Sequence, residues 1–314
     1  MDEWEIPYHE MIIGKEMARG AFAVVHRGTW RGIEVAIKRL ENLSAIAVED
    51  QKNELRILKI VHHPNIVLFL GYAQKDDRLF LVFEWMHGGN LLDAVRIGWT
   101  SRTQQIQWSR NLCTAVLYLH QRTPTRIIHR DLKPSNCLLD RNGMCKIIDF
   151  GISKTVFIQK KRSLQNLQSM YFDNPPSPDN SINGNDVEMD ASTRSRGPVG
   201  TFRYMAPELM MDLVDCSGIR SSEYIDIYSL GMLLYIIWEE KEPFWDYPRH
   251  DIQTFCADVC DGLRPRFSPR TPPEIQVKIM ACWESNPWNR PRAQDLILFF
   301  SSSSFSQGRC CTLM

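Results

Sequence analysis

The stretch from residue 127 to residue 151 constrains the fold of this 314-residue chain more than any other part of the sequence. Short apolar runs flank a polar turn at residues 140–143, a pattern that predicts two strands joined as a hairpin. A loop that ends at Asn136 and one that begins at Asp149 would then emerge at the same end of the hairpin. Amide and carboxylate oxygens suit Mg²⁺, which is usually held by one or two side chains plus substrate phosphates. The sequence therefore predicts that Asn136 and Asp149 share a magnesium ion.

Composition and charge indicate an ordinary globular protein. The chain is 44% hydrophobic and 24% charged, and it is long enough for one large domain or two lobes. Lys+Arg and Asp+Glu are equal at 37 each, so net charge gives no reason to expect a nucleic-acid partner. Nine cysteines without paired C-x-x-C spacing, and an acidic start without an apolar leader, predict reduced thiols and a cytoplasmic location. The longest apolar run, around residues 230–238, predicts a buried helix because it is too short to cross a bilayer.

The N-terminal third contains a lysine and a glutamate that we expect to pair. Residues 33–38 alternate in a way that predicts a strand with Ala36 and Lys38 on one face. From that face Ala36 can lie against an adenine while Lys38 reaches its phosphates. Residues 47–61 have helical periodicity, with Glu54 on the apolar stripe. An unpaired buried charge is costly, so Lys38 is the natural partner of Glu54.

The next elements divide the chain into two parts. Apolar runs at residues 66–71 and 79–83 predict two further strands. A polar, glycine-rich connector follows at residues 84–90, and its exposed backbone can hydrogen-bond a purine edge. Residues 103–121 then predict a long helix. The pattern is that of an N-terminal sheet lobe joined to a helical C-terminal lobe.

Together these motifs resemble the catalytic domain of eukaryotic protein kinases, over residues 4–300. They are similar to the tyrosine-kinase-like group, which includes the Raf, mixed-lineage and plant Raf-like kinases. The matching segments are V-A-I-K at 35–38, Glu54, H-P-N-I-V at 63–67, H-R-D-L-K-P-S-N at 129–136, D-F-G at 149–151, G-T-F-R-Y-M-A-P-E at 200–208, D-I-Y-S-L-G at 226–231 and C-W-E-S-N-P-W-N-R-P at 282–291. The resemblance implies an α+β, two-lobed fold. Its small N-lobe (1–83) has an antiparallel sheet plus one helix, and a hinge (84–89) leads to a larger, mainly helical C-lobe (90–305).

The resemblance also implies an activity and the residues that carry it out. The chain would be an ATP-dependent, Mg²⁺-using serine/threonine kinase that acts on a protein substrate in signalling. Asp131 would accept the proton of the attacking hydroxyl, and Lys133 would offset charge on the transferring phosphoryl group. Lys38 and Glu54 would act on the ATP phosphates. Lys133 after Asp131, together with G-T-F-R-Y-M-A-P-E, favours serine/threonine over tyrosine.

The same resemblance implies a nucleotide pocket with an altered lid. Of the three glycines in G-x-G-x-x-G-x-V only Gly20 is kept, since Ala18 and Ala23 replace the others. Where φ is positive, a Cβ costs about 1 kcal/mol or more, so we expect a less flexible lid with weaker or slower nucleotide handling. This departure favours one alternative, a catalytically weak, membrane-anchored, pseudokinase-like scaffold. The residues implied to surround the nucleotide are Met17, Ala18, Gly20, Ala23, Val25, Ala36, Lys38, Phe83 as gatekeeper, Glu84, Met86 and Leu138.

Other family positions imply contacts that support the site. Asp226 would hold the H-R-D loop from below, and Thr201 would touch Asp131 and Lys133. Glu208 and Arg290 would pair in the C-lobe core. A spine of stacked side chains would join the lobes, formed by Leu58, Phe69, His129 and Phe150.

The activation segment, residues 149–208, is unusually long for a loop. Its middle is rich in Asn, Asp, Ser and Pro, so we expect residues 158–195 to be disordered. Arg130 would seek an anion, and an upstream kinase or the protein itself can supply a phosphate. Thr193 is the first choice of phosphosite, followed by Ser192 and Ser195, with Ser177 in P-S-P as a site for a proline-directed kinase. The alternative is a tolerated surface insertion without a regulatory role.

The tail at residues 306–314 ends in Cys311-Thr312-Leu313-Met314, which fits a C-a-a-X box with Met favouring farnesyl. Stable anchoring takes two signals, so Cys310 would have to carry a second acyl chain. The alternatives are that two exposed cysteines merely end the chain, or that the sequence is a fragment. Association with a membrane is expected only if the box is modified.

Overall fold

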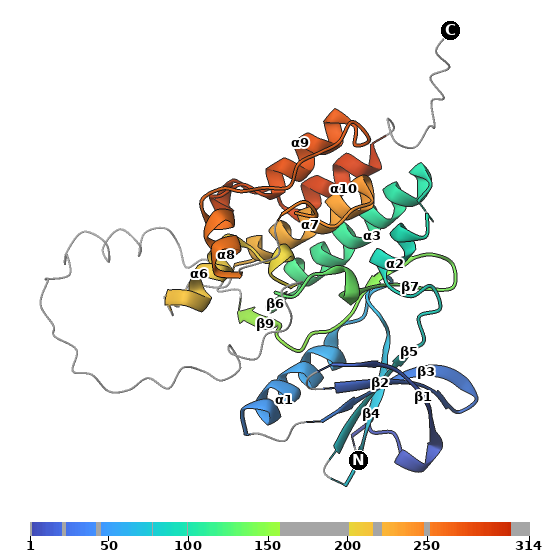
Figure 1. Cartoon of the computed structure of the whole chain (residues 1–314). Helices are drawn as coiled ribbons and strands as arrows, with labels where there is room; N and C mark the ends of the chain where they lie inside the picture. The colour runs from blue at the N-terminus through green and yellow to red at the C-terminus, as the bar shows by residue number, and fades with distance from the viewer. Residues whose placement is uncertain are drawn as a thin grey trace, which may run out of the picture.

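The structure is a computed structural model, and it describes residues 2–20, 23–41, 45–76, 78–98, 100–157, 201–215, 222–247 and 252–302. A sheet with one helix forms the N-terminal lobe, and a larger helical body forms the C-terminal lobe (Figure 1). The α+β, two-lobed fold predicted from the sequence is confirmed.

Five antiparallel strands form the N-lobe sheet in the order β1-β2-β3-β5-β4. The strand predicted at residues 66–71 is misplaced, because the observed strand β4 begins only at Phe69 and ends at Lys75. Ile66 instead bridges to Ile147 of the C-lobe, and the Val67 N–H donates to the Ile147 carbonyl at 2.9 Å. The strands are β1 (Met11–Arg19), β2 (Ala23–Trp30), β3 (Ile33–Leu40), β4 (Phe69–Lys75) and β5 (Arg78–Glu84).

The N-lobe sheet buries apolar side chains on both faces. Val35 and Ile37 of β3 are fully buried in a small cluster on one face. The helix α1 (Ala45–Ile60) belongs to the main core through Ile57 and Leu58. Because neighbouring residues of a strand face opposite ways, Lys38 lies on the face opposite to Ile37. The predicted alternation of β3 is thus confirmed at its centre.

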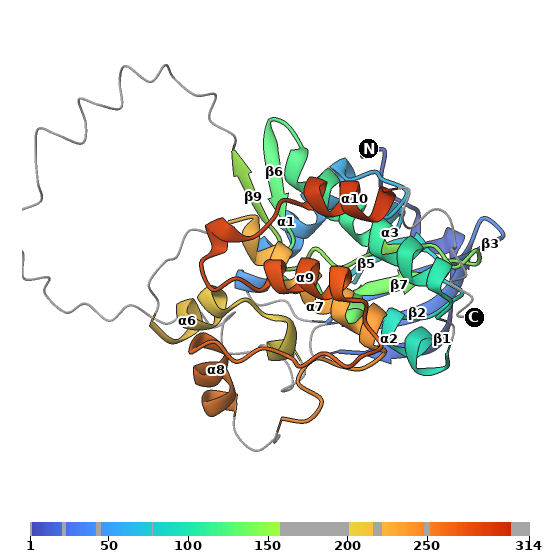
Figure 2. The ribbon, with the colours of Figure 1, turned by 90° about the horizontal axis from the view of Figure 1, so that it is seen from above.

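The C-lobe is built around one buried helix, α7 (Tyr224–Glu239), every residue of which is buried from Ile225 onward. This confirms the buried helix predicted near residues 230–238. Both α3 and α9 pack against α7, and α10 packs on α3 (Figure 2). The other helices among the described residues are α2 (Leu91–Arg96), α3 (Arg102–Gln121), α6 (Pro207–Asp215), α8 (Ile252–Cys260), α9 (Pro273–Cys282) and α10 (Ala293–Ser301). Within the described ranges, no helix is both long and apolar enough to cross a membrane.

Two short antiparallel pairs lie where the lobes meet. The predicted hairpin is present as β7 (Cys137–Leu139) and β8 (Cys145–Ile147). Its turn is closed by Asp140, whose Oδ1 accepts from the backbone N–H groups of Asn142 and Met144 at 2.8 and 2.9 Å. The other pair is β6 (Thr125–Ile128) with β9 (Lys154–Phe157). The described part of the chain also contains short 3₁₀ turns: η1 (Tyr8–Glu10), η2 (Pro134–Asn136), η4 (Thr201–Tyr204) and η5 (Pro287–Asn289).

Candidate active site

Lys38 lies between two carboxylates that come from distant parts of the chain. Its Nζ is 2.8 Å from Glu54 Oε1 on α1 and 2.9 Å from Asp149 Oδ1, which follows β8. The predicted pairing of Lys38 with Glu54 is confirmed. The contact with Asp149 was not predicted, because no local pattern relates residues 111 positions apart.

The electrostatics of this triad keep Lys38 and Asp149 charged. Burial alone would lower the pKa of Lys38, but the charges of Asp149 and Glu54 outweigh it, so the pKa is raised. The charge of Lys38 lowers the pKa of Asp149 to about 2. Burial raises the pKa of Glu54, and the charge of Lys38 opposes that rise. One cation thus holds two carboxylates at the junction of β3, α1 and the hairpin.

Asp131 lies in the loop between β6 and η2, next to a cation and an amide. Lys133 Nζ is 2.7 Å from Asp131 Oδ2, and Asn136 Nδ2 is 3.1 Å from the same oxygen. Asn136 Nδ2 also donates to the Asp131 carbonyl at 2.9 Å. The Asp131 side chain is 15% exposed, so it is accessible from only one side. The structure therefore brings the three predicted residues of this loop together.

Asn136 and Asp149 lie close together at the end of the hairpin, as the sequence predicts. The Ile148 N–H donates to the Asn136 carbonyl at 3.0 Å, which brings residue 149 beside residue 136. Because Asn136 Nδ2 is turned toward Asp131, its Oδ1 is the atom left to bind a cation. Among the residues that the structure describes, no three or more His, Cys, Asp or Glu side chains are grouped so that they could hold a metal ion. Two oxygen ligands are nevertheless a fitting set for Mg²⁺ that arrives with phosphates.

The H-R-D loop is anchored to α7 by Asp226. Its carboxylate accepts from the backbone N–H groups of His129 and Arg130 at 2.9 and 2.8 Å. His120 Nε2 lies 2.8 Å from the same carboxylate. Burial opposes ionisation of Asp226, but these hydrogen bonds and the neighbouring histidines prevail, so its pKa is lowered. The predicted support of this loop by Asp226 is confirmed.

Two non-glycine residues of the site have a left-handed backbone, Arg130 at φ 68° and Asp149 at φ 74°. Such a conformation costs on the order of 1–2 kcal/mol, and it persists only where the surroundings hold it. The hydrogen bonds that the His129 and Arg130 N–H groups donate to Asp226 hold the first of these positions. A contact between the rings of His129 and Phe150, with centroids 5.1 Å apart, lies beside both. Leu58 and Phe69 of the predicted spine are buried in the same core as Phe150.

Most of the residues predicted to surround the nucleotide lie on strands of the two lobes. Met17 lies on β1, Val25 on β2, Ala36 on β3 and Leu138 on β7, and Phe83 is 2% exposed on β5. Ala18 pairs with Val25 in the sheet register.

The lid residues Ala18 and Ala23 have backbone conformations that do not require glycine, while the less flexible lid with weaker or slower nucleotide handling stays a prediction. Neither Ala18 nor Gly20 has a positive φ, and Ala23 is extended and pairs with Leu40. The Gly20 N–H donates to the Ala23 carbonyl at 2.8 Å, which closes this hairpin. Alanine therefore adds no steric cost at these positions in this conformation.

The connector after β5 is tied to the C-lobe by Glu84. Its two carboxylate oxygens accept from Lys146 Nζ at 2.7 and 2.9 Å, and Oε1 also accepts from the Leu68 N–H at 2.8 Å. Met86, two residues on, is 7% exposed. Sequence reasoning missed the pair of Glu84 and Lys146, since neither residue lies in a patterned motif.

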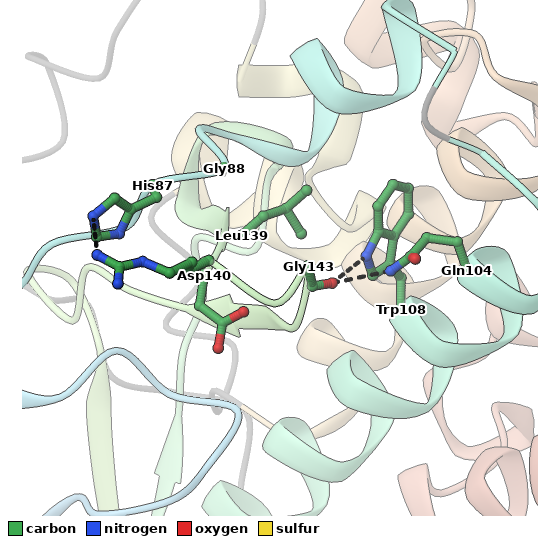
Figure 3. A pocket seen from close by; sticks show the side chains of 8 residues that line it. His87, Gly88, Gln104, Trp108, Leu139, Asp140 and Gly143 are labelled. Carbon is green, nitrogen blue, oxygen red and sulfur yellow. Dashed lines mark hydrogen bonds between the residues drawn. The ribbon is translucent and has the colours of Figure 1, made fainter.

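A pocket of about 280 Å³ lies beside the connector, away from the catalytic residues (Figure 3). The Gly143 carbonyl forms part of its wall and accepts from Trp108 Nε1 at 2.9 Å and Gln104 Nε2 at 3.0 Å. His87, Gly88 and Leu139 complete the wall on the connector side. None of the residues predicted to bind the nucleotide or to catalyse transfer lines this pocket.

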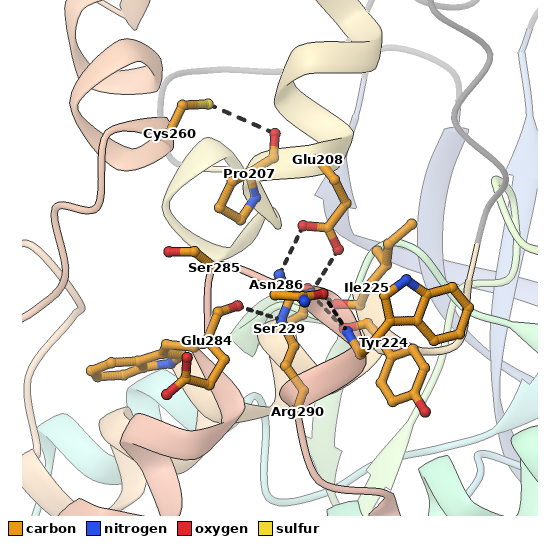
Figure 4. Close-up of polar contacts among 12 residues, drawn as sticks. Pro207, Glu208, Tyr224, Ile225, Ser229, Cys260, Glu284, Ser285, Asn286 and Arg290 are labelled. Atoms are coloured by element: carbon orange, nitrogen blue, oxygen red, sulfur yellow. Dashed lines mark hydrogen bonds and ion pairs between the residues drawn. The ribbon is translucent and has the colours of Figure 1, made fainter.

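The C-lobe core contains the predicted ion pair of Glu208 and Arg290 (Figure 4). The contact is bidentate, with Nη to Oε distances of 2.6 and 2.8 Å. The guanidinium also donates to the carbonyls of Tyr224 and Glu284, each at 2.9 Å. This pairing joins α6 to the start of α7 and to the segment after α9, and it confirms the prediction.

Some predicted residues lie outside the described part of the chain. Thr201 opens η4, but its side chain is not described, so its expected contact with Asp131 and Lys133 stays a prediction. The insert expected to be disordered also lies outside. So do the candidate phosphosites and lipidation sites: Ser177, Ser192, Thr193, Ser195, Cys310 and Cys311.

Comparison with known proteins connects this geometry to a family. The family model described as "Protein tyrosine and serine/threonine kinase" matches residues 11–172 and 180–300. Serine/threonine-protein kinase VIK of Arabidopsis thaliana is 30% identical over 304 residues, which cover 94% of this chain and 61% of that protein. A putative serine/threonine-protein kinase/receptor of Acanthamoeba polyphaga mimivirus is 29% identical over 304 residues (94% and 15%). The probable serine/threonine-protein kinase drkD of Dictyostelium discoideum is 28% identical over 302 residues (94% and 20%). The chain thus spans between 15% and 61% of these relatives.

Proposed function

Because the chain belongs to the protein tyrosine and serine/threonine kinase family, we propose that it transfers the γ-phosphoryl group of ATP to serine or threonine hydroxyls of a protein substrate. One observation carries the proposal. Lys38 contacts both Glu54 and Asp149, while Asp131 lies beside Lys133 and Asn136 in the neighbouring loop. Together they offer a cation for the phosphates and a base for the attacking hydroxyl, which are the groups that phosphoryl transfer requires.

Each residue of the arrangement has a role that follows from its chemistry. Asp131 would accept the proton of the substrate hydroxyl as the hydroxyl attacks phosphorus. Lys133, 2.7 Å from that carboxylate, would offset negative charge on the transferring group. Lys38 would orient the phosphates, and Glu54 would hold Lys38 in place. Mg²⁺, when bound, supplies positive charge to the phosphates, and Asn136 and Asp149 would hold it.

Two features support serine or threonine as the acceptor. Lys133 stands two residues after Asp131, and the segment that ends in Glu208 reads G-T-F-R-Y-M-A-P-E. The relatives named above are described as serine/threonine kinases.

Regulation and location are also part of the proposal. Phosphorylation of Thr193, or of Ser192 or Ser195, would supply an anion for Arg130. Ser177, in P-S-P, would be a separate site for a proline-directed kinase. Farnesylation of Cys311 with acylation of Cys310 would attach the protein to a membrane, because two lipid signals together give stable anchoring.

The test is a radiolabelled-ATP assay of the purified protein with Mg²⁺, beside Asp131→Asn. We expect incorporation that the substitution reduces by at least about a hundredfold, as for loss of general base catalysis. Mapping should place the label on serine or threonine, including sites between Ser163 and Thr201. ATP binding without incorporation in either protein would instead favour the pseudokinase-like scaffold.

A further inference from the structure

A short chain of hydrogen bonds joins α1 to the catalytic loop through Ser153. Asn53 of α1 donates from Nδ2 to the Ser153 carbonyl at 3.1 Å. Ser153 donates from Oγ to the His129 carbonyl at 3.1 Å, and its own N–H donates to the Phe150 carbonyl at 3.0 Å. Ser153 is 4% exposed, so water does not readily replace these bonds. One residue thus contacts α1, the D-F-G turn and the H-R-D loop.

This chain of bonds lies immediately beside the Lys38 triad. Asn53 precedes Glu54 in sequence, so a movement of α1 that separates Asn53 from Ser153 also withdraws Glu54 from Lys38. A Cβ at Gly151 would lie 3.4 Å from Asp149 Oδ1 and 3.6 Å from Glu54 Oε2, so α1 packs closely against the D-F-G turn. An outward movement of α1 would therefore weaken both the bond from Asn53 to Ser153 and the ion pair of Glu54 with Lys38.

The geometry points to Asn53 and Ser153 as positioning residues for phosphoryl transfer, which hold α1 against the D-F-G turn so that Glu54 stays on Lys38. This inference rests on the proposed kinase function, but it concerns residues that need not touch ATP or substrate. Asn53 and Ser153 act through Glu54, Asp149 and His129.

The ion pair of Lys38 with Glu54 does not by itself keep α1 in place. Lys38 has two carboxylate partners, so loss of Glu54 leaves it still paired with Asp149. The ion pair therefore opposes outward movement of α1 less than it would if Glu54 were the sole partner of Lys38. A direct bond from α1 to the backbone at the start of β9 opposes that movement in addition. Ser153 also anchors this backbone to His129, close to the left-handed Asp149.

The experiment uses three variants of the full chain and one matched control. Asn53→Ala and Ser153→Ala each remove one bond, while Asn53→Asp keeps the size of the side chain but cannot donate when ionised. The control is Gln105→Ala, which removes an equivalent amide-to-carbonyl bond, Gln105 Nε2 to the Ile237 carbonyl at 2.9 Å, within the C-lobe. Gln105 is buried, so the control loses at least as much stability without touching α1.

Two readouts are measured, the steady-state constants and the hydrogen exchange of the α1 amides. We expect α1 exchange in Asn53→Ala to rise about fivefold, since one hydrogen bond contributes about 1 kcal/mol and tenfold corresponds to 1.4 kcal/mol. Asn53→Asp should exchange at least as fast as Asn53→Ala. We also expect kcat to fall by about two- to fivefold while KM for the substrate stays within about twofold. The control should change neither quantity.

Unchanged α1 exchange in Asn53→Ala and Asn53→Asp would overturn the inference, as would the same increase in Gln105→Ala. Failure of this inference can be distinguished from failure of the proposed kinase function. If the wild-type protein transfers no phosphate, the proposed function fails, while hydrogen exchange still decides whether Asn53 and Ser153 hold α1.

Discussion

Replacement of Arg290 by alanine should be one of the most destabilising single changes in the C-lobe. The Arg290 guanidinium is fully buried, makes a bidentate contact with Glu208 and donates to two backbone carbonyls. Breaking a buried pair by removing one partner typically costs about 3–5 kcal/mol, because the other charge is left unpaired. The Glu208 side chain is 13% exposed, so some water can reach it and the lower half of that range is expected. The two orphaned carbonyls prevent a much smaller value.

The assay is urea denaturation followed by fluorescence, supported by thermal melting. A loss of about 3–4 kcal/mol should lower Tm by at least about 5 °C in a chain of this size. The double variant Glu208→Leu/Arg290→Met should recover about 1–3 kcal/mol relative to Arg290→Ala, because it leaves no charge unpaired. A single variant that loses less than about 1 kcal/mol, or a double variant whose loss equals the sum of the two single losses, would refute this reasoning.

Three further predictions test other parts of the structure. The pKa of Asp149 is about 2 in the folded protein and about 3.9 when unfolded, so its stabilising contribution is complete above about pH 5 and is lost as pH falls through both values. The stability difference between wild type and Asp149→Asn should therefore shrink between pH 5 and pH 2 in urea titrations, and a constant difference would contradict this. Gly231→Ala should cost about 1–3 kcal/mol despite the higher helix propensity of alanine, since its Cβ would lie 2.6 Å from Cys282 Cβ and 2.7 Å from Trp283 Nε1. A Gly231→Ala variant as stable as wild type would contradict this, and would show that α9 can move away from α7 to make room for the added Cβ. Ala18→Gly/Ala23→Gly should raise kcat/KM for ATP by less than about fivefold, because the alanines restrict the lid without straining it. A larger gain in initial-rate assays would indicate strain that the observed backbone does not show.

The sequence predicted those features that depend on short-range patterns. The β7–β8 hairpin follows from apolar runs around a polar turn, and the buried course of α7 follows from its nearly unbroken apolar sequence. The pairing of Lys38 with Glu54 followed from a different argument, since a charge on an apolar stripe needs a partner. The start of β4 was mispredicted, because residues 66–68 are as apolar as a strand, but Ile66 and Val67 pair with Ile147 of the C-lobe instead.

The amino-acid sequence by itself determined which side chains are available and the order in which the loops carry them. The sequence also determined which side chains share one face of a strand or helix, because strands repeat every 2.0 residues and helices every 3.6 residues. Only the tertiary structure decided which distant groups meet: Asp149 with Lys38, Glu84 with Lys146, and Asn53 with Ser153. The members of each of these pairs lie at least 62 residues apart, so their meeting depends on how the lobes pack and not on local pattern. For the same reason the absence of strain at Ala18 became visible only once the backbone angles were known.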